Sequence, residues 1–138
     1  MKKFFFCVAI ILFAFIGLKA HPINSYKYII IENQDDAAKD IEPRLFDEFQ
    51  KMGFILLSDD LYQGLDEAEK AKVLTAKYRC RQSGECIFKL ELVNQSGEEV
   101  YEDEQIFGGG FMTRKNDRQG AIKRIFKELK KLNYQFEP

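Results

Sequence analysis

Hydrophobic and polar residues alternate most regularly in the middle of the chain, over residues 73–93. Apolar residues occupy the even positions from Leu74 to Leu92, and polar or charged residues occupy most odd ones. A polar stretch at residues 81–85 interrupts the alternation. A period of two is typical of a strand with one buried face. The pattern therefore predicts a β-hairpin with a loop at residues 81–85 and its even-numbered side chains in the core.

Three further strands are predicted, two before this hairpin in the sequence and one after it. Residues 26–31 are β-branched and aromatic on both phases, which indicates a central strand that is buried on both faces. Residues 54–57 form a shorter apolar run. Residues 99–107 follow a turn at 94–97, and their acidic side chains suit an exposed edge strand.

Two segments have the period of a helix. Over residues 40–52 apolar residues recur about every four positions, with Asp40 as a candidate N-cap and Gly53 as a stop. A last helix is predicted after Asn116 or Asp117. Its apolar stripe consists of Ala121, Ile122, Ile125, Phe126, Leu129 and Leu132. The polar segment 60–72 is expected to contain a short helical turn at residues 65–69.

The predicted order of elements is β-α-β-β-β-β-α. It indicates an α+β fold with a mixed β-sheet of about five strands and two helices packed on it. Residues 21–138, the 118 residues that follow the N-terminal segment, have the length of a single domain.

The N-terminal segment, residues 1–20, is interpreted as an export signal. Lys2 and Lys3 precede an uncharged apolar run at residues 4–18, and Ala20 supplies a small residue before a cleavage site. The alternative is a retained membrane anchor, but spanning a bilayer takes about 20 apolar residues. Cys7 lies inside the apolar run and does not form a lipoprotein signal. We therefore expect cleavage after Ala20, a periplasmic or secreted protein, and no membrane span after cleavage.

The net charge of the mature chain argues against nucleic acid as a partner. Removing residues 1–20 takes away three lysines, which leaves 18 basic residues against 22 acidic ones and a net charge of −4. Phosphate binding requires a basic surface instead.

Cys80 and Cys86 are the two cysteines of the mature chain, and an even count in an oxidising compartment favours a disulfide. Both lie on the apolar phase of the hairpin. If they were direct cross-strand partners, Tyr78 would lie opposite Phe88. The alternatives are two buried free thiols, a redox pair and a metal site. A metal site needs further ligands, and the only histidine is His21 at the mature N-terminus.

A run of three glycines at residues 108–110 precedes the last helix. It lacks the lysine and hydroxyl residue that end a P-loop, so a phosphate cradle is disfavoured. The glycines are interpreted as a flexible exit from the edge strand. Phe107, Phe111 and Met112 beside them form a candidate partner-binding lip, unless their side chains fold back onto the core.

No residue pattern indicates catalysis or a cofactor. Carboxylates are plentiful, but their spacing does not place two of them across a cleft, as a glycosidase requires. The serines have no histidine near them in the sequence. We therefore predict a non-enzymatic protein without cofactor or metal, and a carboxylate-dependent hydrolase is the remote alternative.

Residues 25–54, the cysteine-bearing hairpin and the closing helix with Ala121-Ile122 resemble small exported domains of Bacteroidetes-type bacteria. The layout is also similar to periplasmic modules such as the N-terminal domain of TolB, the curli secretion lipoprotein and activators of penicillin-binding proteins. Those modules bind other envelope proteins and are not enzymes. The resemblance implies a protein-binding module and transfers no functional residue.

These observations lead to one functional prediction and one alternative. The chain is predicted to be an exported binding module for another envelope or secreted protein, acting through the edge strand 99–107 or the glycine lip. The alternative is a secreted inhibitor of a hydrolase, which would insert its loop 81–85 into an active site.

Overall fold

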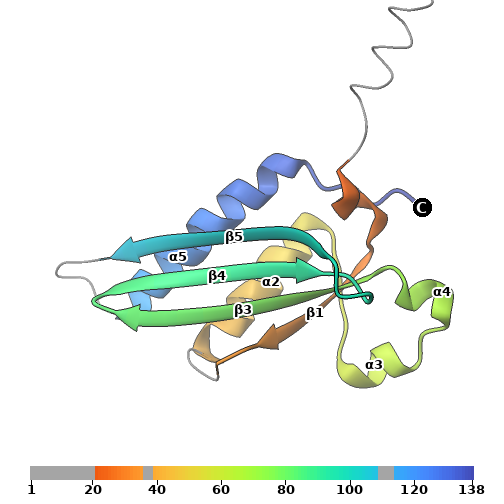
Figure 1. Cartoon of the computed structure of the whole chain (residues 1–138), viewed down its shortest axis with the longest axis horizontal. Coiled ribbons are helices and arrows are strands. Elements are labelled where there is room, and N and C mark those ends of the chain that lie inside the picture. The colour runs from red at the N-terminus through yellow and green to blue at the C-terminus, as the bar shows by residue number, and fades with distance from the viewer. Residues whose placement is uncertain (1–20, 36–38, 109–113) are drawn as a thin grey trace, which may run out of the picture.

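The computed structural model describes residues 21–35, 39–108 and 114–138. Five strands form one mixed sheet in the order β2-β1-β3-β4-β5. Figure 1 shows β1, β3, β4 and β5 side by side in this order. The strands are β1 (Tyr28–Asn33), β2 (Ile55–Leu56), β3 (Val73–Ser83), β4 (Glu85–Val93) and β5 (Glu99–Gly108). β1 is parallel to β2 and β3, whereas β4 is antiparallel to both β3 and β5. The predicted α+β class and five-stranded mixed sheet are confirmed.

Helices α2 (Glu42–Met52) and α5 (Arg114–Leu129) are the two long helices, and they lie against one face of the sheet (Figure 1). α2 follows the 3-10 turn η2 (Lys39–Ile41) and is capped by Gly53. Gly53 has a φ of 107°, a left-handed conformation that glycine adopts readily because it has no Cβ. The predicted cap at Asp40 is wrong. The Asp40 carboxylate instead accepts a hydrogen bond from the Arg118 guanidinium of α5 at 2.8 Å.

The start of α5 and the segment before β3 also differ from expectation. α5 begins at Arg114, so Asn116 and Asp117 lie in its first turn and do not cap it. Residues 60–72 were predicted to contain one helical turn. They form parts of two short helices, α3 (Asp59–Gln63) and α4 (Glu67–Lys70), which begin at the side-chain caps Ser58 and Asp66.

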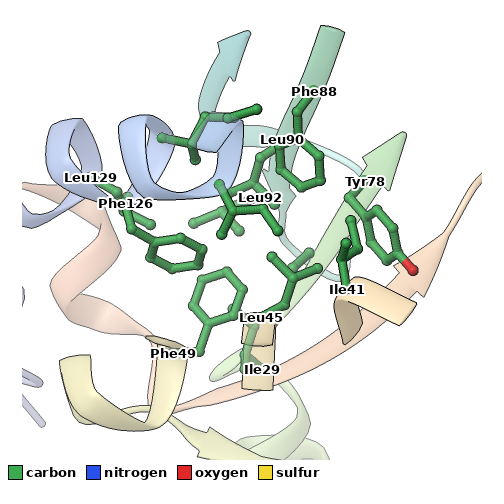
Figure 2. Close-up of a cluster of buried hydrophobic side chains, with 14 of the residues drawn as sticks. Ile29, Ile41, Leu45, Phe49, Tyr78, Phe88, Leu90, Leu92, Phe126 and Leu129 are labelled. Atoms are coloured by element: carbon green, nitrogen blue, oxygen red, sulfur yellow. The ribbon is translucent and has the colours of Figure 1, made fainter. Parts of the chain in front are cut away.

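The core lies between the sheet and the two long helices. The apolar even-numbered side chains of β3 and β4 are buried there, as predicted from the alternation. Figure 2 shows the rings of Phe49 from α2 and Phe126 from α5 next to each other, and their centroids are 4.9 Å apart in an edge-to-face arrangement. The chain end joins this layer, because the ring of Tyr134 stacks on Phe54 at 3.9 Å.

The register of the β3–β4 hairpin corrects the predicted pairing. Cys80 lies opposite Phe88, Cys86 lies opposite Gln82, and the two cysteines are therefore diagonal neighbours. Ser83 pairs with Glu85, which leaves Gly84 as a one-residue turn with a φ of 74°. The predicted loop at residues 81–85 is thus mostly strand. The shift of two positions keeps the same side chains in the core, so the alternation could not reveal it.

Candidate functional site

The second face of the sheet is left uncovered by the two long helices (Figure 1). α3 and α4 shield only the end of this open face where β3 starts. There the Tyr28 hydroxyl donates a hydrogen bond to the Glu69 carboxylate, and the Tyr62 hydroxyl donates one to Gln95, both at 2.7 Å. Around the β3–β4 turn, in contrast, the odd-numbered side chains of β3 are exposed.

Arg79 and Arg81 are these exposed residues, and they make the turn end of the open face basic. Lys89 of β4 lies directly opposite Arg79, which places two cations side by side across the strands. Together with Ile87 and Glu104, these three cations line a hollow of about 190 Å³. Like charges directly opposite each other destabilise a sheet.

The three cations differ in their partners. Lys89 forms salt bridges with Glu91 at 2.6 Å and Glu102 at 3.3 Å. Within the described part of the chain, neither Arg79 nor Arg81 has a hydrogen bond or a salt bridge to its guanidinium. Two guanidinium groups are therefore available to an external carboxylate or phosphate, which they bind through two parallel hydrogen bonds.

A larger hollow of about 720 Å³ lies beside the same two arginines, where β1 stops. The last backbone hydrogen bond along this side runs from the Gln34 amide to the Tyr78 carbonyl at 3.0 Å. β3 continues for another five residues, and no described strand pairs with residues 79–83 on that side. The hollow is lined by Gln34, Asp35, Arg79, Cys80, Arg81, Gln82 and Glu91.

The backbone of β3 turns its polar groups into this hollow. The carbonyls of Lys72 and Tyr78 both accept hydrogen bonds from the β1 side, so even-numbered residues direct their backbone groups that way. By the same alternation, the amides and carbonyls of Cys80 and Gln82 face the hollow. The side-chain oxygen of Gln82 is also buried and has no hydrogen-bond partner in the structure. Buried polar atoms are normally satisfied, so this position is incomplete.

The two cysteines lie beneath this basic region, on the helix-covered face. Both side chains are buried, and their sulfur atoms are 3.1 Å apart as free thiols. The hydrogen bond to Cys86, and then burial, raise the pKa of the Cys80 thiol above its ordinary value. The disulfide therefore stays a prediction. The two cysteines are diagonal neighbours in the hairpin, and their sulfur atoms are in contact.

An acidic cluster occupies the other end of the open face. A bulge between Leu92 and Val93 places Glu99 on the same face as Glu102 and Glu91. A hydrogen bond to Glu102 raises the pKa of the Glu99 carboxyl, while the same contact and Lys89 lower the pKa of Glu102. The sequence did not indicate this pair, because the bulge brings it together. Neither glutamate lines the two hollows, so the pair gives no enclosed catalytic site.

The candidate glycine lip lies partly outside the described residues. Phe111 and Met112 fall in residues 109–113, which the structure does not describe. Phe107 is half-buried and packs against α5, where Gly120 leaves room for its ring and the Arg124 guanidinium lies 4.7 Å from the ring centroid. Its side chain thus folds back onto the core, and its neighbour Ile106 is the exposed one, at 47%.

Residues 21–35, 39–108 and 114–138 contain neither a cluster of metal ligands nor a membrane-spanning helix. In these ranges no three His, Cys, Asp or Glu side chains converge to hold a metal ion. The same ranges contain no helix with the length and apolar character needed to cross a bilayer. Residues 1–20, the predicted export signal, lie outside the described residues.

Sequence reasoning missed the basic region, although a signal for it was present. Arg79, Arg81 and Lys89 all fall on the solvent phase of the predicted hairpin in an acidic chain. Their proximity depends on the register, which the sequence placed two positions away. The sequence also does not indicate that β1 stops opposite Tyr78, which leaves the edge of β3 beside the arginines open.

Comparison with known proteins assigns no family. No family model and no curated protein matches the chain. Among solved structures, a minor lipoprotein from Acinetobacter baumannii is similar over 82% of this chain and 98% of that one, with 15% identity and a TM-score of 0.38. That TM-score is too low to assign a shared fold or function. The comparisons do not support the resemblance to Bacteroidetes-type domains or TolB-type modules.

Proposed function

We propose that this protein is an exported, non-enzymatic module that binds another envelope or secreted protein through the open face of its sheet. The proposal is carried by one observation. Arg79 and Arg81 project from this face beside the free end of β3, and no carboxylate of the described residues forms a salt bridge with either guanidinium, although the charge of Glu102 acts on Arg79 from a distance.

The energetics of the hairpin support a binding role for these arginines. Arg79 lies opposite Lys89, an arrangement that lowers the stability of the sheet. Neither arginine contributes buried apolar area to the core. Arginine is also among the residues that are enriched at protein interfaces and their energetic hot spots. Recognition of a partner therefore accounts for their presence better than folding does.

The edge strand β5 was one of the two surfaces that the sequence indicated for binding, beside the glycine lip. Its outer edge carries acidic side chains, including Glu102 and Glu104, and charged residues are a common protection of edge strands against unwanted pairing. The turn end of β3 is a second free edge with the opposite charge. We place the primary contact there, with Ile106 and Ile87 as apolar neighbours on the same face.

The inhibitor alternative depends on a protruding loop at residues 81–85. That segment is strand up to a single-residue turn at Gly84, so it offers little loop to insert into an active site. Replacing Glu85 at the tip separates the two functions. An inhibitor loses its target on this change, whereas a module that binds through the open face retains its partner.

In-cell photo-crosslinking tests the proposed function. A photo-reactive amino acid at Ile106 reports on the open face, and the same amino acid at exposed Lys123 of α5 is the matched control on the helix-covered side. We expect one reproducible protein adduct from position 106 and none from position 123. Equal adducts from both positions, or none from position 106, would contradict the proposal.

Export is tested separately, by the mass of the protein recovered from the periplasm or the medium. The proposal predicts a chain that begins at His21. An uncleaved chain that stays in the membrane fraction would show that residues 1–20 are a retained anchor.

A further inference from the structure

We propose that the partner contributes an extended acidic segment, which adds as a strand along residues 80–83 of β3 and places its carboxylates on Arg79 and Arg81. This inference rests on the proposed function and names the part of the partner that the site recognises. It belongs to the known class of recognition in which a peptide extends a sheet at a free edge.

The backbone of β3 supplies the first part of the argument. β1 fills the edge of β3 as far as Tyr78, where the Gln34 amide makes the last described hydrogen bond to this edge. Beyond that point the amides and carbonyls of Cys80 and Gln82 face the hollow of about 720 Å³. These are the groups that an added strand pairs with, and the open stretch is about four to five residues long, or about 15 Å.

The arginines supply the second part. Arg79 and Arg81 are two residues apart on one strand, so their side chains leave the same face about 7 Å from each other. Side chains on an added strand repeat with the same spacing. A segment with acidic residues at alternate positions therefore matches both guanidinium groups at once, with bidentate geometry available to each.

The remaining lining residues set the orientation of the charge. Glu91 also lines the hollow, but Lys89 already neutralises it at 2.6 Å. Asp35 stands at the closed end, where β1 stops, and disfavours a carboxylate there. Acidic side chains are thus accepted towards the β3–β4 turn. On the opposite phase, the buried side-chain oxygen of Gln82 lacks a donor, which a hydroxyl or amide on the segment would supply.

A capped peptide that alternates valine and aspartate is the probe for this site. We expect it to bind the mature protein, as measured by calorimetric titration at low salt. The double variant Arg79→Gln/Arg81→Gln should weaken binding by roughly tenfold or more, because two charge-assisted pairs are lost. The matched control is Lys77→Gln on the same strand and face, beside the filled part of the edge, and it should leave the affinity unchanged.

Methylation of the peptide amides separates strand addition from charge attraction alone. Two isomers are made, each methylated on one of the two alternating sets of amides. Strand addition predicts that one isomer loses binding and the other retains it, since only one set faces β3. Equal binding of both isomers would overturn strand addition and leave a simple anion site.

The outcome can be distinguished from that of the proposed function. If the peptide does not bind but position 106 still crosslinks to a partner, the acidic segment is wrong and the module stands. If the peptide binds but no protein adduct forms in cells, the module is wrong. A second peptide carries lysine in place of each aspartate. If both peptides bind with equal affinity, the claim that Arg79 and Arg81 recognise carboxylates is wrong.

Discussion

The two faces of β3 make the clearest comparison within this molecule. On one face Tyr78 is fully buried, and its hydroxyl donates a hydrogen bond to the Glu42 carboxylate at 2.9 Å. On the other face, Arg79 and Arg81 are exposed, and no described residue forms a salt bridge with either guanidinium. Neighbouring residues thus serve different purposes, because a period of two separates them completely. Substitutions on the helix-covered face should change stability, and substitutions at the turn end of the open face should change binding.

The largest effect is expected in the core beneath the covered face. Phe49→Ala removes a fully buried ring that contacts Phe126, and should lower the free energy of unfolding by about 3–5 kcal/mol. Urea denaturation measures this. Phe46→Ala on the same helix is the control, since that ring is 38% exposed and its loss should cost less than about 0.5 kcal/mol. Equal losses would show that α2 packs differently.

Formation of a disulfide between Cys80 and Cys86 should give the next largest change in stability on the covered face. Exchange with oxidised glutathione would join the two sulfurs and transfer the two thiol protons and two electrons to the glutathione, whose own disulfide breaks to give two thiols. The small closed loop should add about 2–2.5 kcal/mol to the free energy of unfolding. The native protein should lack the mass of two hydrogens and resist alkylation until reduced. Two thiols alkylated in unfolded protein taken directly from the export compartment would refute the disulfide.

A smaller change in stability is expected where Phe107 packs against α5. It tests whether the Phe107 side chain belongs to the covered face. A Cβ at Gly120 would overlap the ring of Phe107. Gly120→Ala should therefore lower the free energy of unfolding by about 1–3 kcal/mol, although alanine is the better helix former. Thermal denaturation measures it. A stabilised variant would mean that Phe107 is free to serve as a binding lip.

The arginines of the open face should have almost no effect on stability. Arg79→Gln and Arg81→Gln are each expected to change the free energy of unfolding by less than about 0.5 kcal/mol. The sign should be favourable for Arg79, because the change removes its repulsion from Lys89. A large loss in urea denaturation would show that these side chains hold the hairpin together.

The smallest effect concerns the acidic end of the open face. The folded pKa of Glu99 is raised by its hydrogen bond to Glu102, so its favourable contribution to stability is complete at low pH and is lost as the pH rises through that pKa. Glu99→Gln keeps a donor at every pH. The variant should match the wild type in acid and become relatively more stable towards neutral pH. A difference that does not change with pH would contradict the pairing.

The elements of the sheet were predictable from the sequence, whereas the geometry of the candidate site was not. The alternation in β3 and β4 depends only on which face is buried, and it placed Tyr78 and Phe88 in the core correctly. The register depends on the conformation of the turn at Gly84, a single residue with positive φ. The open edge depends on where β1 ends, which is opposite Tyr78 of β3.

One measurement tests the central claim that stability and recognition lie on opposite faces of the same strands. The double variant Arg79→Gln/Arg81→Gln and the wild type are compared both in urea denaturation and in titration with the valine–aspartate peptide. The claim predicts superimposable unfolding curves and a loss of peptide binding of roughly tenfold or more. An unchanged affinity, or an unfolding midpoint that falls together with the affinity, would contradict it.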